Sequence, residues 1–187
     1  MKTNRLFSLL LLAMAASFIS CAPTQKEDPE TTDSKDRAAM TEKNKIAMQK
    51  VVDAFNSGNA DGLENYVSEN MIDHQEDPNI KSKGLAGLKE AVALYHGAYP
   101  DMKMTVLSLV AEGDMVISHF NMKGTNSGPM GSMPATNKAI DVNGVDIVKF
   151  ADGKGAEHWG YWEEGKMMTQ LGMMPAMGEQ KADTKKK

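Results

Sequence analysis

One short segment near the C-terminus gathers residue types that can do acid–base chemistry. Residues 157–163 contain both tryptophans of the chain, one of its four histidines and two carboxylates. Aromatic side chains favour β-strands, and the period of two in a strand places four of these residues on one face, namely Glu157, Trp159, Tyr161 and Glu163. Such a face suits the wall of a pocket, where the rings contact an apolar ligand and a desolvated carboxylate acts as a general acid or base. The alternative is an exposed edge of the sheet, with the acids in water and the rings half buried.

The histidines do not follow a pattern typical of a metal site. His158 alternates with Trp159 and is therefore expected on the other face of the strand, while His74, His96 and His119 lie far away in the sequence. No pair has the His-x-x-x-His spacing of a helical zinc site. The single cysteine excludes a cysteine-rich metal site and an intrachain disulfide. We therefore expect neither a metal nor another cofactor.

Helices followed by strands must position this segment. An apolar stripe over residues 46–55 predicts a first helix that ends at residues 57–59, because glycine and asparagine favour helix C-termini. Residues 61–67 are predicted as a short second helix and residues 84–98 as a third. Alternation and turn residues then predict four strands, at residues 102–110, 115–123, 139–150 and 155–163. Helices followed by a meander of long antiparallel strands favour an α+β fold.

Six short motifs occur in one order along this predicted domain. They are Ala98-Tyr99-Pro100-Asp101, Val110-Ala111-Glu112-Gly113-Asp114-Met115-Val116, Gly124-Thr125-Asn126-Ser127-Gly128, Asp152-Gly153-Lys154, Glu157-His158-Trp159 and Gln170-Leu171-Gly172. The ordered set resembles the SnoaL-like polyketide cyclase (ester cyclase) family of the nuclear-transport-factor-2-like superfamily, from about Asn44 to Pro175. The resemblance implies a strongly curved antiparallel sheet, wrapped as a cone around the N-terminal helices, with a pocket inside.

The resemblance also implies roles for single residues. In the family an aspartate usually stands four residues after the tryptophan of the Glu-x-Trp motif and acts as general acid and base, and Glu163 holds that position here. The implied chemistry is an intramolecular aldol closure without a metal, and a desolvated Glu163 is expected to have a raised pKa. The family also implies that His74 points into the pocket and orients the substrate or the carboxylate. We expect Glu163 and His74 to be catalytic and Trp159, Tyr161 and Glu157 to bind the ligand.

The N-terminus resembles a bacterial lipoprotein signal. Lys2 and Arg5 precede an apolar run that is too short to span a bilayer comfortably, and Phe18-Ile19-Ser20-Cys21 resembles a lipobox. We expect residues 1–20 to be a signal peptide that is removed, and Cys21 to be lipidated and to anchor the chain to a membrane of the cell envelope. An ordinary secretory signal followed by an unrelated cysteine is the alternative.

The remaining sequence divides into three parts. Residues 21–43 are expected to be a flexible linker because they contain almost no large apolar residue. Residues 44–177 form the predicted SnoaL-like domain and residues 178–187 a charged tail. Loss of two basic residues with the signal leaves 19 basic and 25 acidic residues, a net charge of −6. Such a chain offers no broad basic surface, so we expect no nucleic acid as a partner.

Methionine is the other unusual component, with 16 residues in the chain. Five of them lie in residues 167–177, and Met130 and Met133 lie in a predicted loop. Thioethers can bind Cu(I), but methionine also packs adaptably around apolar ligands, and we favour the second role.

The predicted function is a pocket that binds an apolar small molecule at the cell envelope, with cyclase- or isomerase-type catalysis. A non-catalytic ligand-binding lipoprotein is the alternative, and a methionine-based copper binder is a less favoured one. We also expect a homodimer. Relatives commonly pair through the outer face of the sheet, and here Leu107 and Leu109 alternate with Val106 and Val110.

Overall fold

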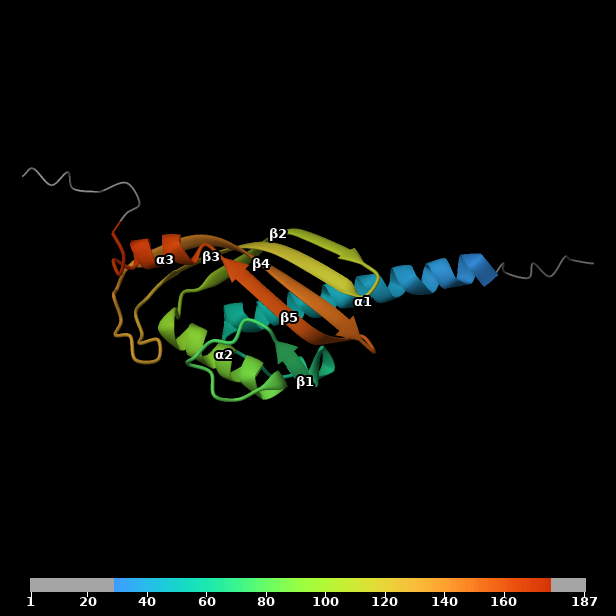
Figure 1. Ribbon diagram of the computed structural model, residues 1–187, viewed down its shortest axis with the longest axis horizontal. Helices are drawn as coiled ribbons and strands as arrows, with labels where there is room; N and C mark the ends of the chain where they lie inside the picture. The colour runs from blue at the N-terminus through green and yellow to red at the C-terminus, as the bar shows by residue number, and fades with distance from the viewer. Residues whose placement is uncertain (1–28, 176–187) are drawn as a thin grey trace, which may run out of the picture.

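The computed structural model describes residues 29–175, with side chains from residue 33 (Figure 1). The predicted signal peptide, Cys21 and the charged tail lie outside the described residues. Along the chain the elements are α1 (Pro29–Ser57), the 3₁₀ turn η1 (Leu63–Asn65), β1 (Val67–Asp73), α2 (Gly84–Ala98), β2 (Lys103–Glu112), β3 (Met115–Thr125), β4 (Ala139–Ala151), β5 (Lys154–Trp162) and α3 (Glu164–Gln170). None of the described helices is both long enough and apolar enough to cross a membrane.

The strands form one mixed sheet in the order β1-β5-β4-β3-β2. Strands β2 to β5 are the antiparallel meander that the sequence predicts, and the α+β fold is confirmed. Strand β1 pairs parallel to β5, and the sequence did not predict it. The expected second helix is only the single turn of η1, because the chain enters β1 at Val67.

Helix α1 begins well before the predicted domain boundary. The prediction of a flexible linker up to residue 43 is wrong for residues 29–43, which are helical. The lack of large apolar residues predicted only that this segment packs against nothing, and the side chains of residues 33–40 are indeed exposed. Ala38 and Ala39 have high helix propensity, and Asp33 and Arg37 form an i,i+4 ion pair at 4.0 Å. In Figure 1 the first turns of α1 extend beyond the sheet.

The rest of α1 and α2 pack against one face of the sheet, which we call the inner face (Figure 1). Most of the alternate side chains of β3 and β4 are buried there, including Val116, Phe120, Val142 and Phe150. Helix α1 is joined to β2 by the side-chain amide of Asn56. Its Nδ2 donates to the carbonyl of Met104 at 2.9 Å, and its Oδ1 accepts from the Met104 N–H at 2.6 Å. Strand β2 also has a bulge between Val106 and Ser108.

Candidate functional site

A cavity of about 200 Å³ lies between the two long helices and the inner face of the sheet. Most of its lining is apolar, from Val51, Val52 and Phe55 of α1 to Phe120, Val148 and Phe150 of the sheet. Six methionines belong to the lining: Met48, Met71, Met102, Met104, Met122 and Met167. Only the last of these comes from the C-terminal methionine cluster of the sequence. Unbranched thioether side chains give a cavity wall that adapts its shape to a ligand.

Three titratable side chains form a polar wall at one part of this cavity. They come from three adjacent strands, Asp73 from β1, His158 from β5 and Asp146 from β4. His158 Nδ1 lies 3.1 Å from Asp73 Oδ1, and His158 Nε2 lies 3.3 Å from Asp146 Oδ1. The three side chains are 39%, 26% and 20% exposed in the order Asp73, His158 and Asp146. We refer to these three residues as the polar wall.

The geometry of the polar wall defines its protonation. An ionised carboxylate only accepts hydrogen bonds, so both ring nitrogens of His158 must carry a proton. Burial disfavours the imidazolium, but the hydrogen bonds and charges of Asp146 and Asp73 outweigh burial and raise the pKa of His158 to about 9. For Asp73, burial acts to raise the pKa, yet the hydrogen bond and charge of His158 prevail and lower it. The polar wall is therefore an imidazolium held between two carboxylates.

A glycine on β5 makes room for this arrangement. Gly160 lies opposite Asp146 in the β4–β5 pair, on the same face as His158. A Cβ at Gly160 would lie 3.1 Å from His158 Cε1 and 3.3 Å from Asp146 Oδ1, which is tighter than ordinary contact. We infer that the glycine allows the imidazolium of His158 on β5 and the carboxylate of Asp146 on β4 to approach each other.

The residues predicted to line the pocket lie on the opposite, outer face of the sheet. The period of two does group Glu157, Trp159 and Tyr161 on one face, but that face is not part of the cavity. Tyr161 is 54% exposed. The prediction that these residues form the wall of the pocket is therefore wrong. The alternative of an exposed edge with its acids in water is also wrong, because β5 lies between β1 and β4 and Glu157 is 27% exposed and paired with Lys149. His158, Gly160 and Trp162 face inward instead.

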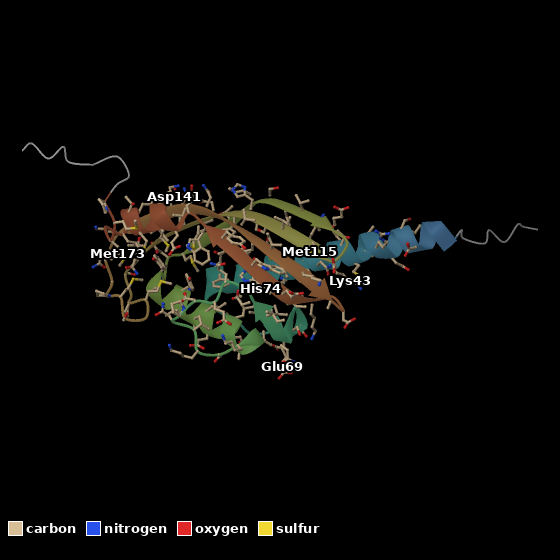
Figure 2. All side chains as sticks on the ribbon, in the orientation of Figure 1. Lys43, Glu69, His74, Met115, Asp141 and Met173 are labelled. Carbon is tan, nitrogen blue, oxygen red and sulfur yellow. The ribbon has the colours of Figure 1, made fainter. Side chains whose placement is uncertain are left out.

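His74 is also on the outer side, where it covers Trp159. The two rings stack at a centroid distance of 4.4 Å and an angle of 4°. His74 Nε2 lies 3.0 Å from Glu157 Oε2, and Lys149 Nζ donates to Glu157 Oε1 at 3.2 Å. Figure 2 labels His74 beside β5. The expectation that His74 points into the pocket is wrong, because these outer-face partners hold it.

Glu163 lies just beyond β5, where α3 begins, and its side chain is 42% exposed. Its carboxylate accepts hydrogen bonds from Lys166 Nζ at 2.9 Å and from the Asn143 N–H at 2.8 Å. These bonds lower its pKa, the reverse of the predicted direction. Glu163 does not line the cavity and does not contact His74, so the predicted pairing of these two residues is wrong.

Two features of the sequence indicate the polar wall, although neither Asp73 nor Asp146 was predicted as a site residue. Asp146 interrupts the apolar run Val145-Asp146-Ile147 in the middle of a strand, where a buried acid needs a partner. His158 was assigned correctly to the face opposite Trp159, but that face was not recognised as the inner one. Within residues 33–175, no group of three or more histidine, cysteine, aspartate or glutamate side chains could hold a metal ion.

The family model for SnoaL-like polyketide cyclases matches residues 45–171. The chain belongs to this family. No curated protein sequence matches the chain significantly. Several solved structures resemble this SnoaL-like protein. TsrD from Streptomyces laurentii has a TM-score of 0.62 and 24% identity, over 69% of this chain and 97% of TsrD.

Two other solved structures are slightly more similar in sequence to this SnoaL-like protein. A candidate polyketide cyclase from Bacillus cereus has a TM-score of 0.61 and 25% identity, over 71% of this chain and 82% of its own. AclR from Streptomyces galilaeus, described as a candidate hydroxylase, has a TM-score of 0.60 and 26% identity, over 72% of this chain and 99% of its own. The SnoaL-like fold that the motifs implied is confirmed.

Proposed function

We propose that this SnoaL-like protein binds an apolar small molecule in its cavity and carries out cyclase- or isomerase-type acid–base chemistry at the polar wall. The observation that supports the proposal is the position of Asp73, His158 and Asp146 at the edge of an otherwise apolar cavity. Titratable groups that converge on an apolar pocket are typical of binding and active sites.

The proposed chemistry assigns a different role to each residue of the polar wall. Asp146 accepts a proton from a carbon next to a carbonyl group of the substrate, and the resulting enolate attacks a second carbonyl of the same molecule. The protonated Asp146 then returns the proton to the new alkoxide. His158, held by Asp73, positions Asp146 and stabilises its charge through the Nε2 hydrogen bond. The apolar lining excludes water from the enolate.

Ligand binding is expected to be lost when the cavity is filled. Ala91 of α2 lines the cavity, whereas Ala93 of the same helix is exposed. Ala91→Phe should weaken the binding of 2-naphthylmethanol at least about 10-fold in isothermal titration calorimetry, and Ala93→Phe should leave it unchanged. Equal affinities for both variants, each folded by circular dichroism, would show that the ligand binds elsewhere.

Catalysis is expected to depend on Asp146 and not on Glu163. Exchange of the α-protons of phenylacetone in D₂O, followed by NMR, reports the enolisation step alone. Asp146→Asn keeps the side-chain shape and removes the base, and should slow the exchange by about 100-fold or more. Glu163→Gln should have no effect, because Glu163 lies outside the cavity. Binding of the ketone without catalysed exchange would favour the alternative of a non-catalytic carrier.

We also propose that Cys21 is lipidated and anchors the protein at the cell envelope, as the lipobox-like sequence indicates. Cys21→Ala should move the protein from the membrane fraction to the soluble fraction when cells are lysed and fractionated. Membrane association that survives this substitution would contradict lipid anchoring.

A homodimer through the outer face of the sheet is a further part of the proposal. Four residues that are neighbours in the strand register form a row across this face: Val110, Ile117, Ile147 and Trp159. Val110 is 60% exposed and Ile117 is 42% exposed. A second copy of the chain, with the same apolar row, would cover these side chains by a two-fold contact.

A further inference from the structure

We infer that the ligand of the cavity carries a hydrogen-bond donor, as an amine or hydroxyl group on an apolar body, and that it is not a carboxylate or another anion. This inference rests on the proposed function, because it concerns the ligand of the same cavity. It follows from the hydrogen-bonding capacity and the charge of the polar wall.

The polar wall has no donor left for a ligand. Both N–H groups of His158 are directed at carboxylate oxygens, at 3.1 Å to Asp73 and 3.3 Å to Asp146. The hydroxyl group of Tyr95, which also lines the cavity, donates to Asp77 Oδ2 at 3.1 Å. These groups therefore leave no donor for a ligand that only accepts hydrogen bonds. A donor elsewhere in the lining is the Nε1–H group of Trp162, which is buried without a partner and can bind a neutral carbonyl oxygen of the ligand.

Acceptors, in contrast, are available. Asp73 Oδ1 accepts from His158 and from the Gln75 N–H, and Asp146 Oδ1 accepts from His158. Within the described residues 33–175, the second oxygen of each carboxylate, Oδ2, has no hydrogen bond, and neither Oδ2 is fully buried. These two carboxylate oxygens at the edge of an apolar cavity can each accept a hydrogen bond from an N–H or O–H group of a ligand. Hydrogen bonds to charged acceptors are stronger than those between neutral groups.

The charges around the cavity favour the same ligands. The polar wall holds two carboxylates and one imidazolium, and Asp77 adds a third carboxylate. The exposed pair of Glu76 and Lys83 at the cavity edge contributes no net charge. The lining is therefore net negative, and in surroundings less polar than water this charge repels an anion and attracts a cation.

Three probes with one aromatic body separate the charge of the ligand from its shape. They are 2-naphthylmethylamine, which is a cation at neutral pH, 2-naphthylmethanol, which is a neutral donor, and 2-naphthoate, which is an anion. Calorimetric titration of the protein should give tight binding of the amine, intermediate binding of the alcohol and at least about 10-fold weaker binding of the carboxylate.

Substitutions in β4 test whether the polar wall causes this order of affinities. Asp146→Asn should reduce the preference for the amine over the carboxylate by about 10-fold. Asp141→Asn, on the outer face of the same strand, should leave the preference unchanged. Asp73→Asn replaces Asp146→Asn if the latter fails to fold. Carboxylate binding as tight as amine binding would overturn this inference and leave the proposed cavity function standing. Failure of all three probes to bind would overturn both.

Discussion

The free energy of unfolding is expected to fall by about 3 kcal/mol as the pH rises from 6.5 through about 9, because His158 loses its proton over this interval. Its pKa is higher in the folded chain than the ordinary value of 6.5, so the folded state binds the proton more tightly than the unfolded state does. This stabilisation is fully present below pH 6.5 and is lost above about pH 9. The deprotonated ring would leave one carboxylate without a donor.

Urea unfolding at a series of pH values measures this dependence. His158→Gln should destabilise the protein at pH 6.5 and should remove most of the fall between 6.5 and about 9. His119→Gln is the matched control, because His119 is exposed on the outer face of β3. If His158→Gln and the parent protein lose stability in parallel with pH, the imidazolium does not hold the polar wall together.

The contribution of Asp73 to the free energy of unfolding has the opposite dependence on pH, at low pH. Its pKa is lowered in the folded chain, so its contribution is present above its ordinary value of 3.8 and is lost as the pH falls through its folded value. Both contributions of the polar wall are therefore complete between pH 3.8 and pH 6.5.

Ile147→Asp is expected to convert the proposed dimer to a monomer. Ile147 lies in the middle of the outer row, between Ile117 on β3 and Trp159 on β5. In a two-fold contact each subunit would bury one uncompensated carboxylate, and an unpaired buried charge costs several kcal/mol. Light scattering of the chain beginning at Ala22 should give half the mass of the parent protein.

Ala93→Asp is the control for this experiment, because Ala93 is exposed on α2 and far from the outer face. It should leave the mass unchanged. A parent protein that is already monomeric at high concentration, or an Ile147→Asp variant that stays dimeric, would show that the outer face is not the subunit interface.

The sequence predicted four of the five strands, but the inner and outer faces of β5 were predicted the wrong way round. A period of two determines which residues share a face, and it does not determine which face points to the core. Rings and carboxylates suggested the inner face for Trp159 and Glu157. Their outer-face partners are His74 and Lys149, and His74 is 83 residues from Glu157 in the sequence. A contact between segments so far apart leaves no pattern within residues 157–163.

A β-bulge in β5 also prevents the faces of this strand from being assigned by one alternation. Lys149 pairs with Glu157 and Phe150 pairs with Gly155, so Ala156 is an extra residue in β5. Gly155 and His158 consequently both face the cavity although they are three residues apart. The strand therefore does not keep one alternation along its length, and residues before Ala156 give no information about the faces of those after it.

The contact between Asn56 and Met104 has a consequence for how the protein behaves in crowded solution. Strand β2 is at the end of the sheet, and a free edge invites another chain to add a strand and begin aggregation. The amide of Asn56 occupies both the N–H and the carbonyl of Met104, so a foreign strand has no free backbone groups at this residue. The bulge after Val106 interrupts the regular spacing beyond it. One helix side chain and one extra residue thus make the β2 edge of the sheet a poorer template for an added strand.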